Sequence, residues 1–281
     1  MKNFFQSIGI ISLMIGSFML TDKISTTSKL SNELLNEIKS KKDGYKENAI
    51  EPLIKDNTII PGVNGKEVDT EKSYEEMSKI GYFSDKLLVY KTLQVEEKLN
   101  KNKDKYIISL NNSKMTISLI FKVDEKDDIT NIIKNLNKRK IKGTFFVNSN
   151  YLEKHHNQII KLINEGHIIG NLSNNEDYTD SDFVWMKTII TNIGNQKNNY
   201  CYTEKEKKEI IKNCKLHDSY TIKPTIIIKN NHLLNIKKLL RPGFIISLEV
   251  NNNLNNEIET ILNYIDSKGY TIKSLEEGLK E

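Results

Sequence analysis

The feature that most restricts the fold of this chain is an alternation of strand-like and helix-like segments beyond Met115. Each strand-like segment is a short apolar run bounded by polar residues, and the runs are MTISLIF, GTFFV, HIIG, PTIIIK and FIISLEV. Segments with apolar residues at helical spacing separate these runs. Strands that alternate with helices predict an α/β fold in which helices cover a mainly parallel sheet or barrel. Functional side chains are then expected on loops at the carboxyl ends of the strands.

The helix-like segments carry their apolar residues on one side. DDITNIIKNLNKRK places Ile129, Ile132, Ile133 and Leu136 on a single face. YLEKHHNQIIKLINEG is predicted to form one continuous helix, and its sheet-facing side would carry Leu152, His156, Ile159 and Ile163.

The N-terminus reads as an export signal. Lys2 precedes a mostly apolar run from Phe4 to Leu20, which at about 1.5 Å per residue is just long enough to cross a bilayer core. We interpret residues 1–23 as a signal-anchor or a signal peptide. The lack of an A-x-A-like site favours the anchor, while the small residues Ser17 and Thr21 leave cleavage open. Because the positive charge precedes the run, the rest of the chain is predicted to be extracytoplasmic, anchored to the cell membrane or secreted after cleavage.

Two regions are expected between this segment and the main domain. Residues 24–60 are interpreted as a stalk or linker, although Leu30, Leu34 and Ile38 share one helical face and would also suit a short packing helix. Residues 61–112 are interpreted as a small α+β lead-in region. It has a PGVNG turn, a helix that Asp69 or Thr70 would cap, and strand-like patterns over 87–95 and 106–110. Residues 113–281 form the predicted main domain.

The charge pattern excludes one class of function and leaves the cysteines open. The net charge of +5 is spread through most of the chain, and no basic run is interleaved with aromatic residues, so nucleic-acid binding is not expected. This charge is compatible with binding to an anionic polymer or a membrane surface. The simpler interpretation is a solvated surface with a slight excess of basic residues. Cys201 and Cys214 could pair in an exported protein or remain free thiols.

A resemblance to a known family rests on two stretches. KGTFFVNSNYLEKHHNQIIKLINEGHIIGN resembles the polysaccharide deacetylase (NodB homology) family, in which a strand ending in TFF leads to a helix and a GHxIGNH turn. LRPGFIISLEV and SKGYTIKSLEEGL resemble the closing segment of that family, so the similarity covers residues 114–279. It implies a distorted β/α barrel that removes N-acetyl groups from chitin-like or peptidoglycan glycans. The family uses a divalent metal such as zinc, held by one aspartate and two histidines, with a second aspartate as base and a later histidine as acid.

The first family motif, FDDG, is altered in this chain. It corresponds to Phe121, Lys122, Val123 and Asp124, so lysine stands at the base position and valine at the position of the metal-binding aspartate. Asp124 and Glu125 follow one and two residues late, where strand alternation would aim them differently.

The remaining motifs are altered as well. The turn GNHxxxH corresponds to Gly170, Asn171, Leu172 and Glu176, so both metal histidines are absent. The preceding His167 is interpreted, with Gly170 and Asn171, as part of a structural turn. The RPPYG loop falls near residues 200–205, where Cys201 stands at the arginine position between Tyr200 and Tyr202, and Glu249 replaces the acid histidine of the closing LH motif.

The other histidines suggest no replacement metal site. No two of them have the i, i+4 spacing of helical ligand pairs, and they are His155, His156, His217 and His232. No metal or other cofactor is therefore expected.

These changes lead to a prediction about function. We expect an exported, membrane-anchored and catalytically inactive protein that binds cell-wall glycan or a membrane or cell-wall protein. The family's cleft would be lined by Lys122, Glu176, Tyr200, Tyr202 and Glu249. Further degenerate cleft positions that could contact a ligand are Val123, Asp124, Leu172 and Cys201. Two alternatives remain open, namely a metal-dependent hydrolase with an altered site and a structural spacer at the membrane.

Overall fold

The computed structural model describes residues 33–173, 178–193, 196 and 198–281. The predicted membrane segment, residues 1–23, lies outside this part of the chain. Among the helices of the described residues, none combines the length and the apolar character needed to cross a bilayer.

The described residues form two compact units. One contains residues 33–49 and 64–94, and the other contains residues 50–63 and 95–281. These boundaries divide both of the predicted N-terminal regions, 24–60 and 61–112. The reason is that residues 50–63 and 95–112 supply short strands that hydrogen-bond into the sheet of the second unit.

The first unit is a small α+β element with its own core. A helix over residues 33–41 is followed by η1 (Lys42–Tyr45), β3 (Gly65–Val68), α2 (Thr70–Ser78), η2 (Asp85–Leu87) and β4 (Tyr90–Leu93). Strands β3 and β4 pair antiparallel, and the buried core contains Leu34, Ile38, Val68 and Met77. The Asp69 carboxylate accepts the Lys72 N–H at 3.2 Å, so Asp69 caps the start of α2.

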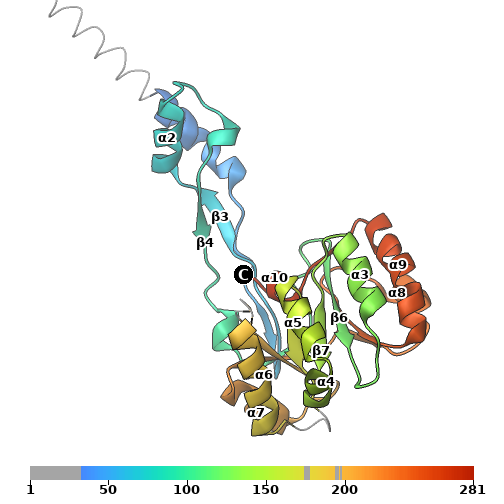
Figure 1. Cartoon of the computed structure of the whole chain (residues 1–281). Helices are drawn as coiled ribbons and strands as arrows, with labels where there is room; N and C mark the ends of the chain where they lie inside the picture. The colour runs from blue at the N-terminus through green and yellow to red at the C-terminus, as the bar shows by residue number, and fades with distance from the viewer. Residues whose placement is uncertain (1–32, 174–177, 194–195, 197) are drawn as a thin grey trace, which may run out of the picture. The chain divides into compact units, whose positions relative to one another are not determined.

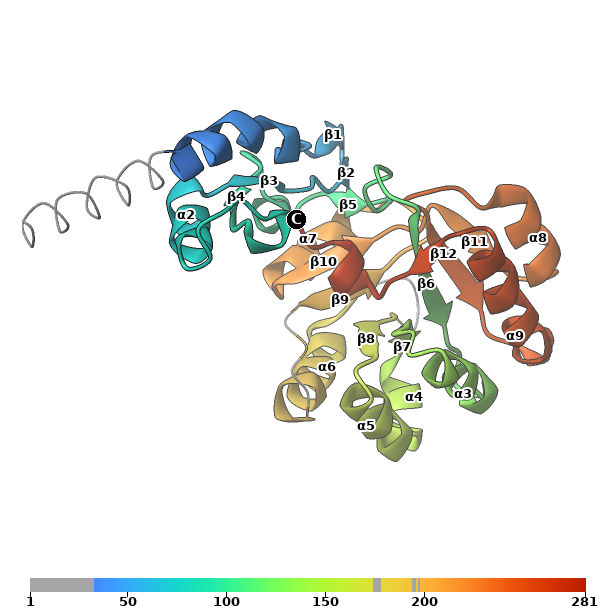
Figure 2. The same cartoon turned by 90° about the horizontal axis from the view of Figure 1, so that it is seen from above.

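The second unit is a mixed α/β fold built on one curled sheet (Figures 1 and 2). Its strands are β1 (Leu53–Lys55), β2 (Thr58–Ile60), β5 (Tyr106–Ile107), β6 (Thr116–Lys122), β7 (Thr144–Val147), β8 (Ile168–Asn171), β9 (Asn199–Tyr202), β10 (Ser219–Ile222), β11 (Ile226–Ile228), β12 (Ile245–Glu249) and β13 (Thr271–Ile272). Its helices are η3 (Leu99–Lys101), α3 (Thr130–Lys138), α4 (Ser149–Lys154), α5 (His156–Asn164), α6 (Asp180–Ile193), α7 (Lys208–Leu216), α8 (His232–Leu239), α9 (Asn252–Ser267) and α10 (Leu275–Gly278).

The strand order explains the shape of the sheet. The order is β1-β2-β5-β10-β9-β8-β7-β6-β12-β11, with β13 beside β6, and all pairings except β1–β2 are parallel. The sheet curls into a half-barrel with β1 and β11 at its ends, and the larger helices lie along the outside of the curl (Figure 2). The α/β class and the parallel order therefore agree with the sequence-based prediction. The resemblance implied a distorted barrel, and the sheet is an open half-barrel.

The two faces of the sheet follow the alternation of the strands. On β6, Ile117, Leu119 and Phe121 pack with the helices in a large apolar cluster, while Ile120 joins a second cluster on the inner face. Lys122 follows Ile120 at a spacing of two, so strand geometry directs its side chain to the inner face as well.

One predicted helix is divided in two. His155 has φ −119° and ψ 27°, which ends α4, and α5 begins at His156. His156, the first residue of α5, is exposed. The prediction that His156 faces the sheet together with Ile159 is therefore wrong.

Candidate functional site

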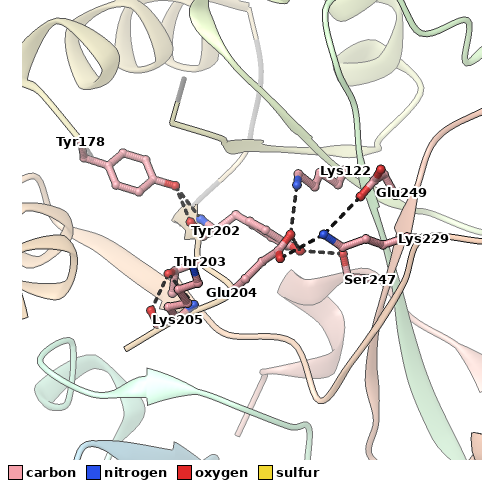
Figure 3. A network of polar contacts seen from close by, with 9 residues as sticks. All are labelled: Lys122, Tyr178, Tyr202, Thr203, Glu204, Lys205, Lys229, Ser247 and Glu249. Carbon is pink, nitrogen blue, oxygen red and sulfur yellow. Dashed lines mark hydrogen bonds and ion pairs between the residues drawn. The ribbon is translucent and has the colours of Figure 1, made fainter. Parts of the chain in front are cut away.

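The candidate site lies at the carboxyl ends of four strands of the second unit. Lys122 is the last residue of β6 and Glu249 the last of β12, and they are paired in register. Tyr202 ends β9, and Lys229 follows the end of β11. Figure 3 shows Lys122, Tyr202 and Lys229 around Glu204, which comes two residues after β9, and Glu249 beside Lys229.

Four charged side chains form a connected set, here called the charge network: Lys122, Glu204, Lys229 and Glu249. The Lys122 ammonium donates to Glu204 Oε1 at 3.0 Å. Lys229 Nζ lies 3.5 Å from Glu204 Oε2 and 3.9 Å from Glu249 Oε2 (Figure 3). The positive and negative charges alternate and cancel, so the network has no net charge.

The central ion pair of the network is shielded from water. The side chains of Lys122 and Glu204 are 22% and 19% exposed. Burial raises the pKa of Glu204, but Lys122 and Lys229 lower it more, so it lies below its usual value. Burial lowers the pKa of Lys122, but Glu204 raises it more, so it lies above its usual value. Both groups are therefore charged at neutral pH, and Lys122 cannot accept a proton there.

Tyr202 joins the network to the sheet. It is buried, and its hydroxyl lies 3.0 Å from Ser247 Oγ and 3.4 Å from Glu204 Oε1. The backbone of Tyr202 is held by Tyr178, whose hydroxyl accepts the Tyr202 N–H at 2.8 Å and lies 2.7 Å from its carbonyl oxygen (Figure 3). Burial raises the pKa of both tyrosines, so their hydroxyls stay protonated as hydrogen-bond donors.

The positions that the family uses for its metal do not fit a metal in this chain. Val123 is fully buried in the apolar cluster beneath the helices, and Leu172 is buried in the inner cluster. Neither side chain has a donor atom. Glu176, at the second histidine position, lies outside the described residues. Among the residues that are described, no three His, Cys, Asp or Glu side chains come together as a metal site would require.

The carboxylates next to Val123 belong to a surface loop. Asp124 is exposed, and its N–H donates to Asp127 Oδ2 at 2.7 Å. Glu125 forms an ion pair with Lys154 at the end of α4. Neither carboxylate is positioned by the contacts that hold the charge network.

Two of the predicted cleft residues lie elsewhere. Cys201 alternates with Tyr202, points to the opposite face of β9 and is bonded to Cys214 of α7, with their Cα atoms 6.3 Å apart. Tyr200 is buried further along the inner face, where its ring stacks on Tyr220 with centroids 6.1 Å apart. Tyr200 therefore lines a different hollow, and Cys201 is buried in a disulfide rather than available to a ligand.

His167 holds the start of β8. Its Nδ1 accepts the Gly143 N–H at 3.1 Å, and its Nε2 donates to Asn137 Oδ1 at 3.1 Å. Burial lowers the pKa of His167 to about 4, so the ring is neutral at pH 7, as these two hydrogen bonds require. The ring also packs edge-on against Phe145. These contacts give His167 a structural role in joining β7, α3 and β8.

Gly170 and Asn171 also serve the packing of β8. A Cβ atom on Gly170 would lie 2.3 Å from the Phe146 ring, so this position has room only for glycine. The Asn171 side chain donates to the Asp182 carbonyl at 3.3 Å and ties the strand to α6.

Sequence reasoning missed Glu204, Lys229, Ser247 and Tyr178. The signal for Lys229 was present, because it follows the predicted strand PTIIIK at its carboxyl end. Glu204 follows β9 in the same way, but the alignment with the family's RPPYG loop assigns Tyr200 and Cys201, and not Glu204, to the cleft. Nothing in the sequence indicates that these residues meet.

Comparisons with known proteins show which family and which folds the chain resembles. Residues 109–224 match the polysaccharide deacetylase family model. YlxY of Bacillus subtilis (strain 168), an uncharacterized protein, is 31% identical over 117 residues. That match covers 41% of this chain, and this chain spans only 37% of YlxY.

Solved structures show the same fold. One is a mutant of BA3943, a CE4 family pseudoenzyme, in which enzymatic activity is restored. It is 20% identical with a TM-score of 0.70, and the match covers 88% of this chain and 98% of the mutant's chain. Wild-type BA3943 from Bacillus anthracis is 21% identical, with a TM-score of 0.69, and covers 88% of this chain and 95% of its own. Bacillus subtilis PdaA, a family 4 carbohydrate esterase, is 20% identical, with a TM-score of 0.54, and covers 62% of this chain and 84% of its own.

The family match, the curled sheet and the motif positions lead to one conclusion. The resemblance assigns the positions of the base, the metal ligands and the acid, and these positions here carry Lys122, Val123, Leu172, Glu176 and Glu249. Residues 109–224 therefore match the polysaccharide deacetylase family model, on a fold shared with the solved CE4 structures, while the positions that the resemblance assigns to metal binding and catalysis carry other residues.

Proposed function

We propose that this protein is an exported, membrane-anchored and non-catalytic member of the family that binds cell-wall glycan at the charge network. The observation that carries the proposal is the ion pair between Lys122 and Glu204 at the position of the family's catalytic base. This pair replaces a proton acceptor with a protonated amine. BA3943, a CE4 family pseudoenzyme with this fold, supports the proposal that the protein is non-catalytic.

Amide hydrolysis would need groups that these positions do not supply. A water nucleophile must lose a proton to a base, and the amide carbonyl must be polarised by an electrophile. The ammonium of Lys122 is already protonated, and Val123 has no atom that could bind a metal. We therefore derive no hydrolytic step at this site.

The charge network is suited to a neutral, hydroxyl-rich ligand. Lys229 and Glu249 have side chains that are 54% and 30% exposed, so their polar atoms can reach a ligand. Alternating ammonium and carboxylate groups offer hydrogen-bond donors and acceptors to sugar hydroxyls and N-acetyl groups. Because the charges cancel, the network offers no net attraction to an anionic ligand.

Two features support a location outside the cytoplasm. The N-terminal run from Phe4 to Leu20 has the composition and length of a signal-anchor. The buried disulfide between Cys201 and Cys214 is a feature of proteins in oxidising compartments.

The test is co-sedimentation of the full chain with purified peptidoglycan. We expect the wild-type chain to sediment with the wall, and the double variant Lys229→Ala/Glu249→Ala to lose most of this retention. The matched control is Lys138→Ala/Glu259→Ala, which removes an exposed ion pair between α3 and α9. Both variants should keep the wild-type circular dichroism spectrum.

Other outcomes would favour the alternatives. Failure of the wild-type chain to sediment would support the structural spacer. Tight binding of about one zinc per chain, with acetate release from N-acetylglucosamine oligomers, would support the hydrolase with an altered site.

A further inference from the structure

A second concave surface lies at the opposite end of the sheet from the charge network. A groove of about 740 Å³ is bounded by the loop from α3 to β7, the C-terminal half of α9, and the segment from β13 to α10. We call it the basic groove, because its charged lining includes Arg139, Lys140, Lys142, Lys273 and Lys280 against only Asp266 and Glu277.

The basic groove lies at the amino ends of the strands. Thr271 of β13 pairs with Thr116 at the start of β6, whereas Lys122 ends the same strand. Six residues of extended strand span about 20 Å, at roughly 3.3 Å per residue. The groove and the charge network are therefore separate sites.

Arg139 lies 3.6 Å from the Glu259 carboxylate, whereas the lysines of the groove are largely uncompensated. Within the described part of the chain, none of Lys140, Lys273 and Lys280 forms an ion pair, and Lys140 and Lys280 are exposed. The Lys142 ammonium donates to the backbone carbonyl of Glu165, which leaves its charge without a carboxylate.

The two acids of the groove offset these charges only in part. Glu277 caps α10, because its carboxylate accepts both the N–H and the hydroxyl of Ser274 at 3.2 Å. Its orientation is thus set by the helix rather than by the lysines. Asp266, on α9, is exposed.

Apolar side chains contribute the rest of the lining. Leu262 is buried, whereas Tyr270 and Ile272 are half-buried against the helix-side core. An elongated ligand with carbon groups between its charges could cover these side chains while its anions meet the lysines. Free inorganic anions would leave them exposed.

We propose that the basic groove binds a linear anionic polymer whose phosphate or carboxylate groups repeat along a polyol or sugar backbone. Charge complementarity carries this assignment, since the lining bears a net positive charge and, among the described residues, none of its lysines is paired with a carboxylate. The ligand differs in charge from the neutral glycan proposed for the charge network, so either proposal can fail without the other.

The test measures binding of fluorescein-labelled poly(glycerol phosphate) and polygalacturonate to the full chain by fluorescence anisotropy. The groove variant is Lys140→Asn/Lys273→Gln/Lys280→Gln. Asparagine is chosen at position 140 because Lys140 has a positive φ of 57°, a left-handed conformation that asparagine tolerates. The matched control Lys134→Gln/Lys212→Gln/Lys238→Gln removes the same charge from exposed positions on α3, α7 and α8.

We expect the groove variant to bind at least one polymer about tenfold more weakly, at the lower end of the effect of a charged cleft on ligand concentration. The control should change affinity by less than about threefold, and wild-type binding should weaken with salt. Preference for poly(glycerol phosphate) would assign phosphate as the recognised group, and preference for polygalacturonate would assign carboxylate.

The proposal is overturned if the two variants lose affinity equally, because binding would then depend on total charge alone. It is also overturned if neither polymer binds, or if the wild-type chain binds vesicles of anionic phospholipid but neither polymer. Thermal unfolding of each variant confirms that any loss of binding does not arise from loss of the fold.

Discussion

The Lys122 ammonium donates to the Glu204 carboxylate at 3.0 Å across the inner face of the curled sheet. Lys122 ends β6 and Glu204 follows β9, and β7 and β8 lie between these strands. The pair thus joins strands that are not neighbours. It bridges the inner face at the end of the sheet where the family resemblance places catalysis.

The coupling between these two side chains can be measured by a double-mutant cycle with Lys122→Met and Glu204→Gln. We expect each single variant to lose roughly 1–3 kcal/mol in the free energy of unfolding, because it leaves a shielded charge without its partner. The coupling energy should be about 1 kcal/mol. Urea unfolding gives these values.

The exposed pair Lys138–Glu259 is the control for this cycle. Its side chains are 69% and 53% exposed, and its coupling should be below about 0.5 kcal/mol. Equal coupling in both cycles would show that the Lys122–Glu204 pair gains nothing from its shielded position.

The same pair predicts a pH window. Because the pKa of Glu204 is lowered from 4.5, its contribution to stability is present above that pH and is lost as the pH falls through the folded-state pKa. Because the pKa of Lys122 is raised from 10.5, its contribution is present below that pH and is lost as the pH rises through the folded-state pKa. The coupling energy should therefore be constant between pH 6 and pH 9, and a change within that range would contradict the assigned charges.

His167 provides a second pH prediction. Its pKa is about 4 in the folded chain against 6.5 for the free side chain, so the unfolded chain binds a proton first as the pH falls. This group should destabilise the fold by roughly 3 kcal/mol in total as the pH falls from 6.5 to 4. Urea unfolding of His167→Gln should lack this part of the pH dependence, whereas His156→Gln, at an exposed position, should retain it.

The outer framework could be predicted from the sequence because it depends on periodic patterns. Alternation from Ile120 to Val123 separates Ile120 and Lys122 from Phe121 and Val123, and the structure places Ile120 in the inner cluster and Phe121 and Val123 in the helix-side cluster. The short strands β2 and β5 escaped prediction as part of the main sheet. Two or three residues carry no measurable period, and long-range pairing decides their place.

The site could be predicted only in part for a related reason. Family motifs identify Lys122 and Glu249 because both lie in the aligned strands. Glu204 and Lys229 meet them only because β9 and β11 end at the same edge of the curled sheet. Such a meeting depends on the curvature of the sheet, which no local pattern specifies.

Gly170 should be indispensable because of its distance from Phe146. A Cβ atom there would lie 2.3 Å from the ring, and that ring in turn packs on Tyr202 with centroids 5.3 Å apart. We expect Gly170→Ala to lose about 1–3 kcal/mol of unfolding free energy through overpacking. Adding Phe146→Leu should recover part of that loss, and purely additive effects in urea unfolding would contradict the steric explanation.

The disulfide between Cys201 and Cys214 should stabilise the site from the outer face of the sheet. It connects β9 to α7 and spans 13 residues, a loop for which closure in the unfolded chain corresponds to about 3 kcal/mol. Cys201 also precedes Tyr202, so the bond fixes the strand that carries the tyrosine in contact with the charge network.

The variant Cys201→Ser/Cys214→Ser should have a free energy of unfolding lower by about 3 kcal/mol, measured by urea unfolding. The reducing agent dithiothreitol should destabilise the wild-type chain and leave the variant unchanged. Because the two cysteines are bonded to each other, thiol titration of the non-reduced chain in denaturant should detect no free thiol. Wild-type stability that does not respond to the reductant would show that the bond does not constrain the fold.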